Sequence, residues 1–363
     1  QRLKPAGGAP SDPTSPFAQG YIADRRYPTV SAFGIPSVND APVFSPATAA
    51  LLGAMQGFPF PFQVGITDNP ANPLAGNPLA FNRNGELVPI DFGVEAGDFV
   101  SADGGSGFAA PGSLLAPSRR YLATVVTDYE LTDSIRLYGE GWYANSKGTQ
   151  LTGQPEYNSV LFGDRGGASG NLQISINNPF LSDQARSIIA ANLSANPLAL
   201  TDQFFLLGRA NTDLISGKAS TTTETYRLVG GIDGDFDAFG SQMRFDASVN
   251  YGKSVLQGDG RAIIFQNLLK AVDAVRVGNS IQCASYPSSP MPSISATCFP
   301  INPFGANISQ EARDFVTART NPRSESDQLV FTASVTGSLF DLGAGPAGFA
   351  LGYEHRRETA SFD

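Results

Sequence analysis

The stretch "TETYRLVGGIDGDFDAFGSQMRFDASVNYGKS", residues 223–254, alternates apolar and polar side chains on both sides of a short turn. Such period-2 alternation is typical of a β-strand whose two faces lie in different environments. The returning half is the most regular: Met243, Phe245, Ala247, Val249 and Tyr251 alternate with Arg244, Asp246, Ser248 and Asn250. The stretch therefore predicts an antiparallel hairpin with one apolar and one polar face.

Two further stretches follow the same pattern, so three hairpins are predicted at about residues 119–147, 221–256 and 325–359. Each strand covers roughly 10 to 14 residues, which exceeds the usual 5 or 6 of soluble sheets. About 9 to 11 tilted residues suffice to cross a bilayer core. Several apolar faces end in Tyr or Phe, as the interface girdles of membrane barrels do. The sequence thus predicts an all-β fold, a segment of an antiparallel transmembrane β-barrel.

The connections at one end of the predicted sheet are much longer than those at the other end. Within each hairpin the turn is short, whereas long loops occupy about residues 150–220 and 257–324. Short turns on one side and long extracellular loops on the other are typical of bacterial outer-membrane barrels. Loops of this length are usually functional.

The long loops contain helical signals. "NNPFLSDQARSIIAANL" from Asn177 and "INPFGANISQEARDFVTAR" from Ile301 share Asn-Pro-Phe, then Ser, then Ala-Arg. Ser182 and Ser309 are suitable helix N-caps. "IIFQNLLKAVDAV", residues 263–275, has apolar residues at helical spacing. We expect short helices in these loops; whether the two similar segments are a repeat or a coincidence stays open.

Residues 1–117 carry fewer signals and are rich in Pro and Gly. We predict a further extracellular loop region there, with a small hairpin at Asn84-Gly85. Residues 118–363 are predicted to form the partial barrel. The chain begins with Gln1 without a secretory leader and ends in strand-like sequence, which favours a fragment of something longer.

Composition limits the partners. The formal charge is -9 and the isoelectric point is about 4.7, which argues against a nucleic-acid partner. No apolar stretch reaches the ~18 residues of a transmembrane helix, and a modest mean hydropathy is compatible with a barrel because half of each strand faces a polar lumen.

The two cysteines, Cys283 and Cys298, flank a Pro/Ser-rich stretch. They lack a second ligand pair for zinc and form no CxxC redox motif. A disulfide on an exposed loop in an oxidising compartment is favoured, with free thiols and a metal site as the alternatives.

The polar residues at alternate positions of the predicted strands form the candidate site. We predict that eight charged residues face the lumen: Arg136, Glu140, Arg227, Asp233, Arg244, Asp246, Glu354 and Arg356. They are expected to pair across strands or to hold a plug. Asp233, Asp235 and Asp237 lack the further ligands of a calcium loop. No nucleophile elbow, P-loop or dinucleotide motif is present, so no catalytic residue, metal ligand or cofactor is predicted, and ligand-binding residues are not assigned.

Several phrases, in order, resemble the TonB-dependent receptors of bacterial outer membranes. They are "YELTDSIRLYGEGWY", "TYRLVGGIDGDF", "MRFDASVNYGKS", "CFPINPFG", "SQEARDFV" and "SLFDLGAGPAGFALGYEHRRE". The resemblance runs from about Ser118 to Asp363 and implies part of a 22-stranded barrel. The family's plug and TonB box have no counterpart in this sequence.

The resemblance implies uptake of a scarce nutrient, such as siderophore-bound iron, cobalamin or a saccharide, across the bacterial outer membrane. Its expected partners are outer-membrane lipid, a small-molecule or oligosaccharide ligand, and the TonB complex through the missing plug region; no enzymatic activity is expected. Two alternatives remain: an outer-membrane porin, and a secreted β protein that binds or cleaves glycans.

Overall fold

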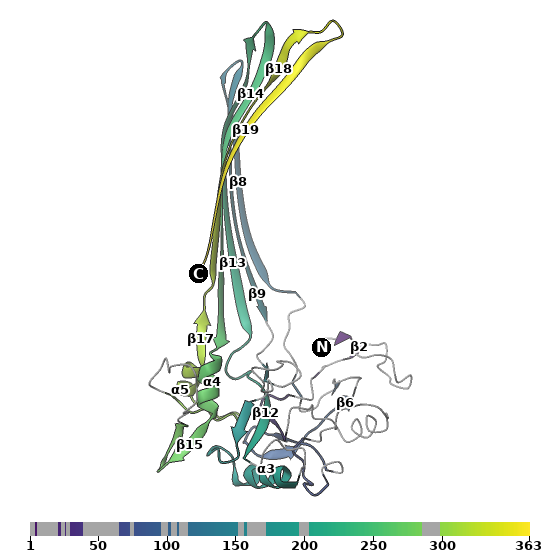
Figure 1. Cartoon of the computed structure of the whole chain (residues 1–363), viewed down its shortest axis with the longest axis vertical. Coiled ribbons are helices and arrows are strands. Elements are labelled where there is room, and N and C mark those ends of the chain that lie inside the picture. Colours follow the sequence, from purple (N-terminus) through teal and green to yellow (C-terminus); the bar gives the residue numbers. More distant parts are fainter. Residues whose placement is uncertain are drawn as a thin grey trace. The chain divides into compact units, whose positions relative to one another are not determined.

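The described part of the chain is mostly antiparallel β-structure with a few short helices, as a computed structural model shows (Figure 1). It comprises residues 4–5, 21–22, 26, 30–38, 65–72, 76–95, 101–102, 107–108, 115–151, 156–157, 172–195, 203–284 and 298–363. None of the helices in these ranges combines the length and the apolar character needed to cross a membrane. Residue contacts divide the chain into two compact units.

The sheet unit comprises Ser113–Leu151, Lys218–Gly260 and Arg319–Asp363. Its main strands pair in chain order, each antiparallel to the next, as an up-and-down meander (Figure 1). The strands are β8 (Ser118–Thr132), β9 (Ile135–Leu151), β13 (Lys218–Ala238), β14 (Ser241–Ile263), β18 (Arg323–Asp341) and β19 (Pro346–Phe362). A short strand, β17 (Thr317–Thr320), also pairs with β14.

The three predicted hairpins are present, but their strands extend beyond the predicted bounds. β13 begins at Lys218 and β14 continues to Ile263, past the predicted start of the loop at about residue 257. The turn between them holds Phe239 and Gly240, both with positive φ, which is the geometry of a tight hairpin turn. At the opposite end, the chain leaves the sheet after Leu151 and again after Ile263.

The loop unit comprises Gln1–Gly112, Thr152–Gly217 and Arg261–Ala318. Its central strand, β12, is flanked by β3, β10 and β11, and β4 pairs with β5. The elements of this unit are β1 (Lys4–Pro5), β2 (Tyr21–Ile22), β3 (Ile35–Ser37), β4 (Leu79–Phe81), β5 (Leu87–Pro89), β6 (Val94–Glu95), β7 (Ser101–Ala102), β10 (Glu156–Tyr157), β11 (Leu172–Ser175), α3 (Asp183–Ala195), β12 (Phe204–Ala210), α4 (Phe265–Val272), β15 (Ala274–Val277), β16 (Ser280–Cys283) and α5 (Gln310–Val316).

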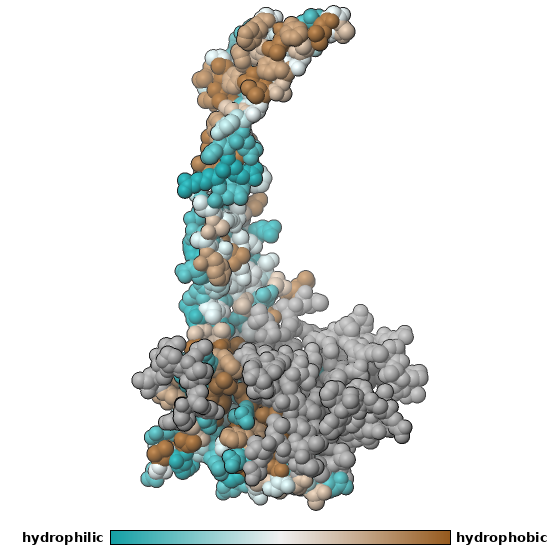
Figure 2. Space-filling view, viewed as in Figure 1, coloured by the Kyte–Doolittle hydropathy of each residue, from teal (hydrophilic) through white to brown (hydrophobic). Residues whose placement is uncertain are grey.

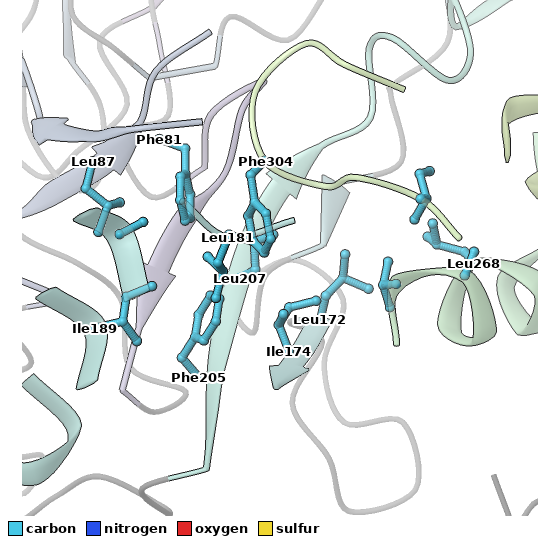
Figure 3. Packing of buried hydrophobic residues seen from close by; sticks show 14 of the residues in the cluster. Phe81, Leu87, Leu172, Ile174, Leu181, Ile189, Phe205, Leu207, Leu268 and Phe304 are labelled. Atoms are coloured by element: carbon cyan, nitrogen blue, oxygen red, sulfur yellow. The ribbon is translucent and has the colours of Figure 1, made fainter. Parts of the chain in front are cut away.

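A hydrophobic core holds the loop unit together (Figure 3). Phe304 lies between the rings of Phe81 and Phe205, with ring centroids 4.7 and 6.2 Å apart. These three residues come from segments far apart in the sequence, so the core joins both long loops to the part of the chain before residue 118. The division into 1–117 and 118–363 predicted from sequence differs from this grouping by contacts.

Arg209 is buried in the loop unit with 1 % of its surface exposed. Its guanidinium donates to the Pro303 carbonyl at 3.0 Å, to Asn211 Oδ1 at 2.8 Å and to Asp213 Oδ2 at 2.6 Å. A buried charge is tolerable only when it is paired and hydrogen-bonded in this way. Nothing in the sequence "FFLLGRA" marked this arginine as interior.

The two similar segments of the long loops adopt the same local structure. In each, the Asn side chain accepts from the backbone N–H of Phe two residues later, at 3.0 Å for both Asn178 and Asn302. In each, the predicted N-cap serine accepts from the backbone N–H three residues later, at 3.2 Å for both Ser182 and Ser309. The shared sequence therefore encodes one capped-helix motif used twice.

Both motifs contact the hairpin turn between β4 and β5, where the sequence predicts the Asn84-Gly85 turn. The Ser182 hydroxyl donates to the Gly85 carbonyl at 3.3 Å. The backbone N–H of Ala306 donates to the Arg83 carbonyl at 3.0 Å. The rest of the predicted region 1–117 lies partly outside the described residues. The predicted helix at 263–275 is shorter in the structure, since α4 ends at Val272 and a strand follows.

Candidate functional site

The candidate site is the polar face of the sheet unit, built from alternate residues of its main strands. Residues directly opposite each other in neighbouring strands lie on the same face of a sheet. The register joins Arg136, Asp233 and Asp246 in one row. A second row joins Glu140, Val229, Asn250, Val330 and Arg356. By the same register, all eight residues predicted to face a lumen share this one face.

Asp233 is the centre of the charge network on the polar face. Arg136 Nε donates to Asp233 Oδ1 at 3.0 Å, and Arg244 Nη2 lies 3.6 Å from Asp233 Oδ2. The Asp233 side chain is 13 % exposed, whereas those of Arg136 and Arg244 are 50 % and 68 % exposed. Two cations from neighbouring strands thus share one largely buried carboxylate.

A second cluster on the polar face surrounds Arg227. Its guanidinium lies 3.7 Å from Glu140 Oε2, donates to Asn250 Oδ1 at 3.2 Å and stacks 5.7 Å from the ring centre of Trp142. Cation–π contacts of this kind favour arginine over lysine. Asn250 and Trp142 were not among the predicted site residues, although they share the parity of those that were.

Asp246 and Glu354 complete the predicted set with different partners. The Tyr138 hydroxyl donates to Asp246 Oδ2 at 3.0 Å. Glu354 pairs along its own strand with Arg356 at 3.1 Å, and Arg356 also lies 3.7 Å from Glu358. Ser248 and Thr332 share a hydroxyl–hydroxyl bond of 2.8 Å between them. The polar face therefore carries a network of paired charges and hydroxyls from neighbouring strands.

The opposite face of the same sheet is apolar over one continuous band next to the hairpin turns. In Figure 2, brown residues gather at the end of the sheet that carries the turns, and teal residues lie farther along the strands. The band contains large side chains that are exposed in the described structure: Tyr121, Val125, Tyr129, Leu131, Leu137, Tyr226, Leu228, Val249, Tyr251, Leu329, Phe331, Leu351 and Tyr353. Along β14 it runs from Met243 to Tyr251, which matches the ~9 to 11 residues that cross a bilayer core.

Tyrosines mark the edge of the apolar band that lies away from the turns. Tyr143 and Tyr226 face each other in register, with ring centroids 5.2 Å apart. On the same face, the charged Lys253 lies directly opposite Tyr226, and Glu224 follows beyond the two tyrosines. Amphipathic rings between an apolar and a charged zone are typical of a membrane–water interface.

The polar face is not uniformly polar. Leu122 and Val126 of β8 are exposed on it, directly opposite Ala144 and Glu140 of β9. Both lie on an edge strand of the described sheet, whose outer side has no partner strand among the described residues. Arg119 and Arg120 are consecutive in β8 and therefore lie on opposite faces of the sheet.

Cys283 and Cys298 form a disulfide in the loop unit. Cys283 ends β16, and Cys298 lies shortly before the core residues Ile301 and Phe304. By restricting the unfolded chain, a disulfide that closes a loop of this size contributes roughly 3 kcal/mol to the free energy of unfolding. Among the described residues, no group of three or more His, Cys, Asp and Glu side chains is arranged to hold a metal ion.

Asp233→Asn keeps the size of the side chain and removes its charge. We expect the free energy of unfolding to fall by about 1–2 kcal/mol, because the carboxylate is buried while solvent screens both arginines. The matched control is Asp235→Asn, on the same face but exposed, with an expected change below ~0.5 kcal/mol. Urea titration of the protein in lipid vesicles measures both; equal losses would contradict the role of the shared carboxylate.

Comparison with known proteins does not identify a family for this chain. No protein-family model matches the chain, and no curated protein matches it. Among solved structures it is similar to the crystal structure of the siderophore receptor PiuA from Acinetobacter baumannii, with 12 % sequence identity and a TM-score of 0.22. The match covers 68 % of this chain and 30 % of that one, so the chain spans less than a third of the receptor. At this level of similarity nothing about function is transferred.

Proposed function

We propose that this chain is part of a bacterial outer-membrane β-barrel of the TonB-dependent receptor type, which imports a scarce nutrient. The observation that carries the proposal is the two-faced sheet. One face has an apolar band of bilayer-crossing length with tyrosines at its edge, and the other has paired charges suited to a water-filled or protein-filled interior.

The loop unit supports a receptor more than a simple channel. The long connections leave the sheet at the end opposite the hairpin turns and share a hydrophobic core of their own. A folded extracellular unit offers a surface that can bind a ligand before transport, and function is often carried by such long loops. The nutrient would be siderophore-bound iron, cobalamin or a saccharide, and energy would come from the TonB complex.

The proposal is tested by nutrient uptake in a bacterial strain that depends on this protein. The full-length protein is expressed in a strain lacking its own receptors, and growth is followed with iron-siderophore, cobalamin or oligosaccharide as the limiting nutrient. We expect growth on one of them to be rescued, and the rescue to vanish when TonB is deleted. Rescue that persists without TonB would indicate a passive porin instead.

The membrane assignment is tested separately by gel mobility. A barrel extracted in detergent migrates differently before and after heating, because the folded sheet resists unfolding until heated. A protein that stays monomeric and stable without detergent would overturn the membrane assignment and favour a secreted β protein.

A further inference from the structure

An apolar patch interrupts the polar face of the sheet unit around Trp142. Leu122 and Val126 of β8 are 68 % and 70 % exposed, and Trp142 of β9 is 48 % exposed. The register places Trp142 directly opposite Thr124, which lies between Leu122 and Val126 along β8. The three apolar side chains are therefore neighbours on one face of the sheet. We call the set of Leu122, Val126 and Trp142 the tryptophan patch.

Polar groups border the tryptophan patch on the side of β13. Arg227 stacks on the Trp142 ring and also contacts Glu140 and Asn250. The side chains of Arg227 and Glu140 stay 43 % and 37 % exposed, so both remain open to a ligand. Their opposite charges balance each other. The guanidinium, the carboxylate and the amide together offer hydrogen-bond donors and acceptors next to an apolar surface.

Gly252 leaves room on the far side of Arg227. It lies directly opposite Arg227 in β14, and a Cβ added to it would meet only the Tyr226 carbonyl oxygen, 3.9 Å away. The row from Trp142 to Gly252 crosses two strand spacings, roughly 10 Å at ~4.8 Å each. A ligand that lies on Trp142 can therefore extend over Arg227 toward Gly252 without meeting a side chain there.

Farther from the hairpin turns, the polar face is rich in hydroxyls and poor in charge. In the two rows that begin at Leu122 and at Arg120, Arg120 carries the only charge among the described residues. The hydroxyl side chains of these rows are Ser146, Thr223, Thr225, Ser254, Ser324 and Ser326. The Asp233 network lies on the other side of Trp142, toward the turns. This part of the face therefore suits an uncharged ligand with many hydroxyls.

The tryptophan patch lies at the same level along β9 as the edge of the apolar band on the opposite face, because Trp142 precedes Tyr143. If Tyr143 sits at the outer membrane surface, as the proposed function requires, the patch faces the barrel interior at that level. All residues of the patch and its border belong to the sheet unit. A ligand that enters from the loop end would meet the hydroxyl rows first and the patch next.

We propose that the tryptophan patch and its border bind a neutral oligosaccharide, an inference that rests on the proposed function and narrows its nutrient to one class. A sugar ring has an apolar C–H face, which packs on Trp142 as apolar ligand surfaces pack on aromatic side chains. Its hydroxyls donate to the Glu140 carboxylate and accept from the Arg227 guanidinium and the Asn250 amide. An acidic ligand finds no excess positive charge here to offset the loss of its hydration.

The test is isothermal titration calorimetry on the purified full-length protein in detergent, with maltohexaose, xylohexaose and mannohexaose as probes. We expect at least one of them to bind, and Trp142→Ala to weaken that binding about tenfold or more, because aromatic anchors dominate such surfaces. Trp142→Phe keeps an aromatic ring and is expected to retain binding within about threefold. Hexagalacturonate, with a carboxylate on every sugar, is expected to bind the unaltered protein about tenfold more weakly or worse.

Two glycine variants provide a matched pair on the two faces of the sheet. Gly252→Leu fills the space beside Arg227 and is expected to weaken oligosaccharide binding about tenfold or more. Gly230→Leu adds the same side chain on the apolar face, where a Cβ would have no atom within 4 Å. We expect unchanged binding in this control. Heat-modifiable gel mobility of each variant verifies that it is folded.

Three results would overturn the inference. The first is the absence of binding by all three neutral oligosaccharides, and the second is binding that does not respond to Trp142→Ala and Gly252→Leu. In either case, a loss of stability in Trp142→Ala would make the patch a packing surface for another protein segment. The third is a ferric siderophore or cobalamin whose binding, in place of that of a sugar, is lost in Trp142→Ala.

Failure of this inference differs from failure of the proposed function. Growth that depends on TonB and on siderophore-bound iron or cobalamin would keep the proposed function and remove only the oligosaccharide site. A protein that neither inserts into vesicles nor shows heat-modifiable mobility would remove the membrane orientation, and the site at its outer surface with it.

Discussion

Leu228→Arg is expected to lower the stability of the protein in a bilayer by about 2–4 kcal/mol, because it places a charge on the lipid side of the sheet. Leu228 is 61 % exposed and lies between Gly141 and Tyr251 in the apolar band. An arginine at this position would have no carboxylate directly opposite it on either neighbouring strand. Urea-dependent folding into lipid vesicles measures the change.

The next residue provides the matched control. Val229→Arg introduces the same side chain on the polar face, directly opposite Glu140 and Asn250. We expect a change of no more than about 1 kcal/mol, since the new guanidinium reaches water and a carboxylate. If Val229→Arg costs as much as Leu228→Arg, or more, the assignment of the two faces is wrong.

Gly305→Ala is expected to destabilise the loop unit by about 3 kcal/mol or more, through overpacking against backbone. Gly305 is buried with φ of 76°. A Cβ at this position would lie 2.5 Å from the Arg83 carbonyl oxygen and 2.9 Å from the Gly85 nitrogen. Neither atom belongs to a flexible side chain, so relief requires the hairpin turn to move away from the second Asn-Pro-Phe motif.

Gly278→Ala separates the steric effect from the backbone effect. Gly278 also has a positive φ, 58°, but a Cβ added at this position would have no atom within 4 Å of it. Only the left-handed backbone penalty remains, about 1–2 kcal/mol. In both variants, hydrogen–deuterium exchange of the peptides that contain α3 and α5 measures the free energy of opening of the loop unit. A loss for Gly305→Ala no greater than that for Gly278→Ala would contradict the tight contact between motif and turn.

The sheet could be predicted because period-2 alternation is a local property. From Tyr226 to Tyr251 most side chains match the polarity of the face on which they lie, although Val229 does not, and this alternation assigned the charged residues to one face before any register was known. The ends of the strands could not be predicted in this way. Residues 220–225 are polar at every position, so the start of β13 shows no alternation and reads as loop.

The loop unit was less predictable because its core depends on contacts between distant segments. The serine N-caps were visible as short-range signals, and both occur in the structure. The packing of Phe81 on Phe304 joins residues more than two hundred positions apart, and no local pattern reports it.

The most direct test of the membrane-embedded sheet is a scan of single labels along β13. A fluorescent label is attached in turn at each position from Leu228 to Asp233 in the full-length protein, reconstituted in vesicles of brominated lipid. The account predicts strong quenching at residues 228, 230 and 232 and weak quenching at 229, 231 and 233. Uniform quenching, no quenching, or the opposite alternation would contradict it.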